Sequence, residues 1–140
     1  MRRSQPSRHY VIQVTENEIA RQVVDSAYRV HTALGPGLLE SVYQAVLSLE
    51  IGGRGLHHVC QQPVPVAYGP VRLKLGFRAD IVVEDKVIVE IKSVEEVVPV
   101  HKKQLLTYLR LMDRRLGLLI NFNVVLIKNG ITRVVNGLPE

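Results

Sequence analysis

The sequence predicts an α/β protein in which a mixed central β-sheet is flanked by helices. Apolar residues repeat with helical spacing between residues 15 and 50 and again after residue 99, whereas the segments between and beyond are short apolar runs bounded by turn residues. The order along the chain is helix, helix, several strands, helix and strands, which is typical of helices packed against one sheet. At 140 residues, the chain is long enough to bury the core of a single domain.

Composition and charge indicate the class of protein and of partner. The chain is 46% hydrophobic and 22% charged, as ordinary globular proteins are. Cys60 is the only cysteine, the apolar runs are too short to span a bilayer, and "MRRSQPSRHY" lacks the apolar segment of a secretory signal. We therefore expect a cytoplasmic protein without a membrane partner. The net charge of +5 favours a polyanionic partner such as nucleic acid.

Two helices are predicted in the first third of the chain. We expect residues 1–14 to form a polar lead-in segment or a first short strand, and residues 15–140 to form the domain. "TENE" fits a capping box with Thr15 as N-cap and Glu18 reaching back to it, and Gly35 ends the helix. The predicted buried face of this helix is Ile19, Val23, Ala27, Val30 and Leu34. A second helix follows "GPG", ends at "GGRG" and is expected to bury Leu39, Val42, Val46 and Leu49.

The rest of the chain predicts strands around a third helix. "VCQQPVPVAY" and "VRLKL" are strand candidates, and the two prolines of the first confine it to a sheet edge. A hairpin spans residues 78–93, and Pro99 opens a helix that runs to about Arg115. "GLLINFNV" predicts a strand buried on both faces, and "KNG" predicts a tight turn into the strand "ITRVV".

Three charged residues interrupt the apolar hairpin "GFRADIVVEDKVIVEIKS". If residues 84–86 form a three-residue loop, Val83 faces Val87, and counting back places Asp80 opposite Glu90. Side chains paired in this way have Cβ atoms about 5 Å apart, so two carboxylates would repel each other. Lys92 lies two residues beyond Glu90 and therefore on the same strand face.

A divalent cation between Asp80 and Glu90 would remove this repulsion. Oxygen ligands select a hard ion, Mg²⁺ or Mn²⁺, and Lys92 would lie beside it, where an ammonium group can orient a water or stabilise charge on a phosphate. The competing interpretation is that the charges only mark a solvated strand face. A slip of one residue in the register would also move Glu90 to the other face of the sheet.

The sequence resembles a known nuclease family at several places. Asp80, Glu90 and Lys92 in "D…EIK" resemble the signature of the PD-(D/E)XK nuclease superfamily, with Ala79 where the signature has proline. "GLLESVY", from Gly37 to Tyr43, is similar to the motif that names the GxxExxY family, a branch of that superfamily. "QQPVPV", "QLLTYLRL" and "LGLLINFN" follow the pattern of that family in its order.

The resemblance implies a restriction-endonuclease-like core and Mg²⁺-dependent hydrolysis of nucleic-acid phosphodiester bonds. It implies that Asp80, Glu90 and the backbone carbonyl of Ile91 bind the metal, with Glu40 contributing a further carboxylate from the second helix. Lys92 would position the attacking water or stabilise the pentacovalent phosphate.

Further residues are expected to support the site. Gln104 and Tyr108 match the helical motif of the superfamily, and helical spacing places His101 on the same side of the third helix. Tyr43 either holds Glu40 in place or packs with a polar tip, and packing is favoured. We expect DNA as the nucleic acid, and a homodimer is compatible with cutting both strands.

A catalytically inactive nucleic-acid-binding or protein-interaction module on the same fold is the alternative function. The joint presence of Asp80, Glu90, Lys92 and Glu40 favours the nuclease, because an inactive site would be free to lose some of them.

Overall fold

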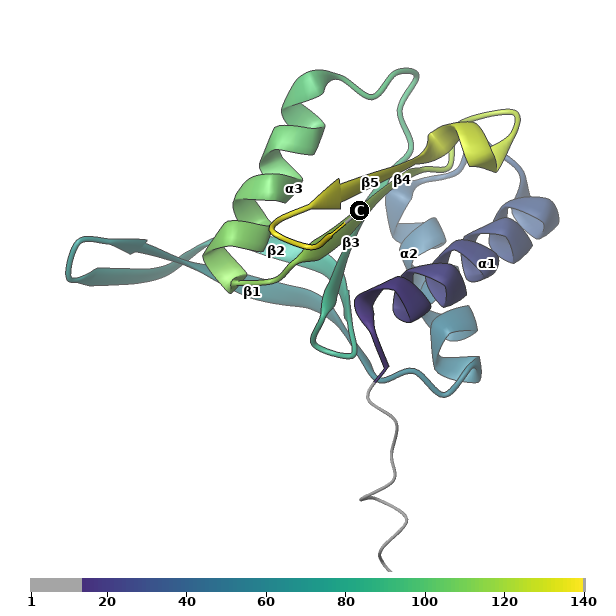
Figure 1. Ribbon diagram of the computed structural model, residues 1–140. Helices are drawn as coiled ribbons and strands as arrows, with labels where there is room; N and C mark the ends of the chain where they lie inside the picture. Colours follow the sequence, from purple (N-terminus) through teal and green to yellow (C-terminus); the bar gives the residue numbers. More distant parts are fainter. Residues whose placement is uncertain (1–13, 140) are drawn as a thin grey trace, which may run out of the picture.

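The computed structural model describes residues 14–139 and shows a five-stranded sheet with helices on both faces (Figure 1). The elements are α1 (Glu16–Leu34), α2 (Glu40–Gly53), β1 (His58–Tyr68), β2 (Val71–Val83), β3 (Val87–Lys92), α3 (Pro99–Met112), β4 (Leu116–Asn121), the 3₁₀ helix η2 (Ile127–Gly130) and β5 (Ile131–Val135). The strand order is β1-β2-β3-β4-β5, and only β3 and β4 pair in parallel, joined through α3. The predicted α/β class with a mixed central sheet is confirmed.

Helix α1 begins and packs as the sequence predicts. The Thr15 hydroxyl accepts a hydrogen bond from the Glu18 amide, and the Glu18 carboxylate accepts one from the Thr15 amide, which completes the capping box. The first four residues of the predicted face are buried, whereas Leu34, at the last turn, is 38% exposed.

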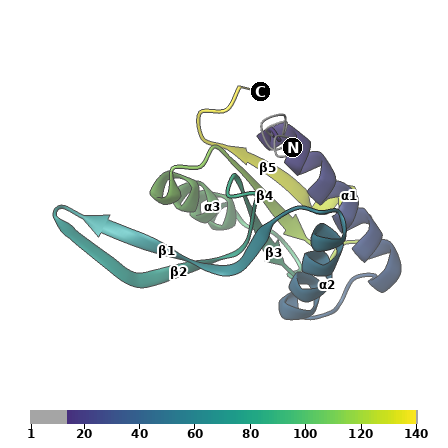
Figure 2. The same ribbon diagram turned by 90° about the horizontal axis from the view of Figure 1, so that it is seen from below.

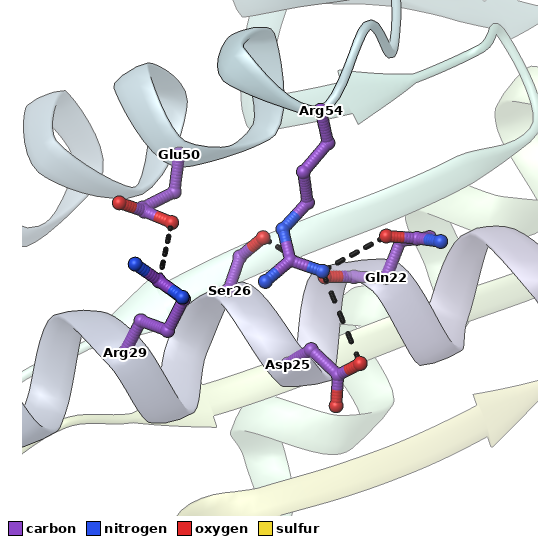
Figure 3. A network of polar contacts seen from close by, with 6 residues as sticks. All are labelled: Gln22, Asp25, Ser26, Arg29, Glu50 and Arg54. Atoms are coloured by element: carbon purple, nitrogen blue, oxygen red, sulfur yellow. Dashed lines mark hydrogen bonds and ion pairs between the residues drawn. The ribbon is translucent and has the colours of Figure 1, made fainter.

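Helices α1 and α2 lie together on one face of the sheet, and their solvent side is joined by polar contacts (Figure 3). The Arg29 Nε lies 3.3 Å from a carboxylate oxygen of Glu50. Arg54, just after α2, donates a hydrogen bond of 2.8 Å to the Gln22 side chain and lies 3.9 Å from the Asp25 carboxylate. Because each ion pair has one largely exposed side chain, Arg29 or Asp25, the contacts orient the helix pair more than they stabilise it.

The predicted buried face of α2 is wrong for three of its four residues, because Leu39, Val42 and Leu49 are exposed and only Val46 packs against the core. Leu39 is 72% exposed and Leu49 is 75% exposed, whereas Tyr43, Leu47 and Ile51 are fully buried. These three residues follow one another at intervals of four, so they form one stripe on the helix. The sequence of α2 is apolar on several sides, and the sheet beneath it selects the stripe that becomes core.

Helix α3 covers the opposite face of the sheet (Figures 1 and 2). Its buried residues Leu105, Tyr108 and Leu109 pack on strand residues that include Ile88 and Leu119. The helix ends at Met112 rather than near Arg115, because Asp113 adopts a left-handed conformation with φ 55° and ψ 50°.

Two predictions about the strands are confirmed and two are wrong. β1 is an edge strand, and β4 is buried along its whole length. "VRLKL" and the first half of the predicted hairpin are one continuous strand, β2, which runs through Gly76 without a break. "KNG" is the end of the 3₁₀ helix η2 rather than a two-strand turn.

Only the last residue of the predicted lead-in segment is among the described residues. The predicted lead-in of residues 1–14 lies outside the described residues except for Val14, whose carbonyl oxygen accepts a hydrogen bond of 2.7 Å from the Lys86 ammonium. Among residues 14–139, no helix combines the length and the apolar character needed to cross a bilayer.

Candidate metal and catalytic site

Asp80 and Glu90 meet where β2 and β3 part. The ladder between the strands runs from Val83 opposite Val87 to Ile81 opposite Val89, which is the predicted register. Beyond Ile81 and Val89, backbone amides bond to side-chain carboxylates instead of to backbone carbonyls. The Asp80 amide donates to a Glu90 carboxylate oxygen over 2.8 Å, and the Ile91 amide donates to an Asp80 carboxylate oxygen over 2.8 Å. The Asp80 and Glu90 side chains therefore lie at the same point of the sheet, and the backbone of Ile91 lies beside them.

Burial makes this acid pair energetically costly. Glu90 is only 6% exposed, and its burial, followed by repulsion from Asp80, raises its pKa to about 8. Burial also raises the pKa of Asp80, although its hydrogen bond from the Ile91 amide opposes the shift. Within the described part of the chain, no Lys, Arg or His nitrogen forms an ion pair with either acid. The pair thus lacks a positive partner in direct contact.

Lys92 supplies positive charge nearby without forming an ion pair. Its backbone is fixed in the sheet, because it lies opposite Asn121 in β4 and its carbonyl oxygen accepts a hydrogen bond of 2.9 Å from the Phe122 amide. Lys92 is half-buried, and its positive charge partly offsets the rise that burial causes in the pKa of Asp80 and Glu90. The strand therefore holds Lys92 next to the acids and leaves its ammonium available.

Glu40 approaches the same end of β3 from α2. It is the first residue of that helix, and its carboxylate accepts a hydrogen bond of 3.3 Å from the Ser93 amide. Its charge contributes to the raised pKa of both strand acids. In residues 14–139, however, no three side chains of His, Cys, Asp or Glu lie close enough together to hold a metal ion. The close group is the pair of Asp80 and Glu90, and Glu40 lies outside it.

The donor chemistry of the pair nevertheless fits a hard divalent cation. Both side chains present carboxylate oxygens, which Mg²⁺ and Mn²⁺ prefer, and Mg²⁺ usually binds one or two carboxylates while keeping several waters. A cation would also oppose the burial and the repulsion from Asp80 that together raise the pKa of Glu90.

Tyr43 lies in the core rather than at the acid pair. Its hydroxyl donates a hydrogen bond to the Gly35 carbonyl and accepts one of 3.2 Å from the Leu38 amide. Its ring stacks on Phe122 with centroids 4.5 Å apart. Tyr43 therefore fixes the loop between α1 and α2, and through that loop the start of the helix that carries Glu40.

The three residues expected from α3 have different environments. Tyr108 is buried, and desolvation, followed by repulsion from Glu90 and Asp80, raises its pKa to about 12, so its hydroxyl stays protonated near the acids. Gln104 is half-buried one helical turn earlier. His101 caps the helix instead, because its Nδ1 accepts a hydrogen bond of 3.2 Å from the Val98 amide.

Gln61 is a site residue that the sequence pattern does not single out. It lies on β1 between the residues that pair with Ile81 and Ala79, and therefore opposite Asp80. Its φ of 55° is unusual for a strand residue. Its side-chain amide donates to the Asp80 carboxylate over 3.2 Å and to the Gln44 side chain over 2.7 Å. "QQP" contains no charge, so only knowledge of the β1–β2 register could have revealed this contact.

The comparisons with known proteins agree with this geometry. Residues 17–134 match the family model of the PD-(D/E)XK nuclease superfamily. The chain matched no curated protein and no solved structure.

Proposed function

Because the chain belongs to the PD-(D/E)XK nuclease superfamily, we propose that it is a nuclease that hydrolyses nucleic-acid phosphodiester bonds with Mg²⁺ or Mn²⁺. We further assign it to the GxxExxY branch, on the motif from Gly37 to Tyr43. The observation that carries the proposal is the buried pair of Asp80 and Glu90, two acids whose ionised forms repel each other, with a lysine beside them and no contacting cation among residues 14–139.

The metal would be held by Asp80, Glu90 and the backbone carbonyl of Ile91. Glu40 would act through a water, because its carboxylate lies at Ser93 rather than inside the acid pair. When bound, the cation supplies positive charge to the phosphate and lowers the pKa of a coordinated water.

The chain's own groups then have separate tasks. The Lys92 ammonium can hold the attacking water or stabilise the negative charge that develops on the phosphate oxygens. The water oxygen forms the new bond to phosphorus and releases a proton to solvent, while the bond to the leaving oxygen breaks and that oxygen takes up a proton from solvent. The protonated hydroxyl of Tyr108 can donate a hydrogen bond to the phosphate, and Gln104 lies one turn away to support the substrate. Gln61 fixes the orientation of the Asp80 carboxylate.

The proposal extends to partners and location. The excess of 18 Lys and Arg over 13 Asp and Glu favours nucleic acid, and we propose DNA as the substrate. A homodimer would bring two such sites to the two strands. The single cysteine suits a cytoplasmic protein.

A cleavage assay tests the proposal. Purified protein is incubated with single- and double-stranded DNA and RNA in the presence of Mg²⁺, Mn²⁺ or EDTA. We expect cleavage that requires the metal and that falls about a hundredfold or more in Glu90→Gln. Glu96→Gln, which removes an exposed acid from the loop before α3, should retain activity. Parent protein that leaves every substrate uncut would instead support an inactive binding module on the same fold.

A further inference from the structure

The hairpin of β1 and β2 extends well beyond the body of the protein. Figures 1 and 2 both show its outer part as a two-stranded ribbon that protrudes past α3. We call residues 63–78 the hairpin arm. Its strands pair from Pro63 opposite Arg78 out to Tyr68 opposite Val71, with an irregularity between Val64 and Val66. The base of the arm belongs to the core under α3, because Val64 is fully buried, whereas Tyr68, Val71 and Leu73 farther out are exposed.

The charged side chains of the hairpin arm are all positive. Residues 58–79 contain no Asp or Glu, and the arm carries the cations Arg72, Lys74 and Arg78. All three are exposed, and none forms an ion pair among the described residues. They line one shared hollow of about 560 Å³ together with Pro63 and Pro65. A surface with three unpaired cations and no acid is complementary to a polyanion.

This basic surface is continuous with the candidate metal site. The Arg78 guanidinium donates to the Gln61 carbonyl over 3.4 Å, and the Gln61 side chain donates to the Asp80 carboxylate. On the same part of β2, the Phe77 ring lies 5.1 Å from the ring of Tyr108. A nucleic acid lying along the hairpin arm would therefore reach Asp80 without crossing an acidic surface.

We propose that the hairpin arm docks duplex DNA and delivers its backbone to the carboxylate pair, an inference that rests on the proposed nuclease function. A two-stranded β-ribbon, whose strands lie about 4.8 Å apart, fits the DNA major groove of about 12 Å. The major groove of duplex RNA is too deep and narrow for such a ribbon. Arg72, Lys74 and Arg78 contact phosphates and position the duplex without reading its sequence.

Binding measured without cleavage tests the proposal. The double variant Arg72→Ala/Lys74→Ala is compared with the parent protein by fluorescence anisotropy, with a short labelled DNA duplex in EDTA at several salt concentrations. Each phosphate contact contributes about 0.9 to the slope of log affinity against log salt, so the double variant should lose about 1.8 of that slope. Its affinity at about 0.1 M salt should fall tenfold or more.

A matched control separates the hairpin arm from net charge. Arg21→Ala/Lys128→Ala removes the same charge from exposed positions on α1 and η2. It should retain the salt slope of the parent protein. An equal loss of slope in this control, or an unchanged slope in the arm variant, would overturn the proposal. Tighter binding of duplex RNA or single strands than of duplex DNA would overturn the assignment of the substrate.

Cleavage by the same proteins distinguishes this proposal from the nuclease function on which it rests. With Mg²⁺, the arm variant should cut DNA more slowly at low substrate concentration and approach the parental rate at saturation, because its acid pair is intact. If the parent protein binds duplex DNA through the arm but never cuts it, the proposed nuclease function is wrong and the proposed DNA-docking role of the arm stands. If the parent protein cuts DNA and the arm variant binds and cuts DNA equally well, only the proposed DNA-docking role of the arm is wrong.

Discussion

Lys92 is the residue whose replacement separates a nuclease from a protein that only binds a metal ion. If its ammonium stabilises charge that develops on the phosphate, that charge matters in the transition state and much less in substrate binding. We expect Lys92→Ala to lower the turnover rate about a hundredfold or more while DNA affinity stays nearly unchanged. Single-turnover cleavage and anisotropy measure the two quantities, and undiminished cleavage in Lys92→Ala would contradict the assigned role.

Glu90 makes a prediction about pH. Its pKa is raised from 4.5 to about 8 by burial and by Asp80, so the folded protein holds a proton that the unfolded chain has released. Because the native state binds more protons between these two values, the free energy of unfolding of the metal-free protein should decrease as pH rises from about 4.5 to 8.

The variant Glu90→Gln tests this dependence, since its amide does not titrate. We expect it to remove part of the loss of stability between pH 5 and pH 8 and to be more stable than the parent protein at pH 8. Urea denaturation in EDTA measures the difference, and Glu96→Gln is the control with an exposed acid. An identical pH dependence in parent and Glu90→Gln would show that Glu90 is ionised throughout this range.

At the scale of elements, the loop between α1 and α2 depends on one hydroxyl. Tyr43→Phe keeps the ring on Phe122 but removes the partner of the Gly35 carbonyl and the Leu38 amide. We expect a loss of about 1–3 kcal/mol in the free energy of unfolding, measured by urea denaturation. Tyr28→Phe, at an exposed position of α1, should change it by less than about 0.5 kcal/mol. Equal values for the two variants would mean that the hydroxyl of Tyr43 does not stabilise the loop.

The hairpin of β2 and β3 shows what the sequence can predict. A three-residue loop and the strand period of two determine which side chains face each other, so the pairing of Asp80 with Glu90 follows from the sequence alone. The capping box of Thr15 and Glu18 can also be predicted, because the two residues are only three positions apart. In both places, residues close in sequence interact with one another.

Features that depend on distant packing could not be predicted in the same way. The buried stripe of α2 depends on the sheet beneath the helix, and its sequence offers several apolar sides. The left-handed Gln61 and the continuity of β2 depend on how two long strands pair across many residues. The position of Glu40 at Ser93, outside the acid pair, depends on how α2 packs against β3.

At the scale of the whole molecule, metal binding should be linked to folding stability. The acid pair costs free energy in the folded protein, and only the folded protein brings its oxygens together. At a hundredfold excess over the dissociation constant, Mg²⁺ or Mn²⁺ should therefore raise the melting temperature by about 5 °C or more. Asp80→Asn should reduce this increase, and an unchanged increase in this variant would place the ion elsewhere.

The most direct test of a metal-dependent nuclease centre on β2 and β3 is a crystal structure of the protein soaked with Mn²⁺, with anomalous scattering to locate the ion. We predict an anomalous peak within coordination distance of carboxylate oxygens of both Asp80 and Glu90, with the carbonyl of Ile91 as a further ligand. Two results from a fully soaked crystal would contradict the proposed metal site. In one, Mn²⁺ is bound only away from Asp80 and Glu90; in the other, those two carboxylates remain bonded to the backbone amides with no ion between them.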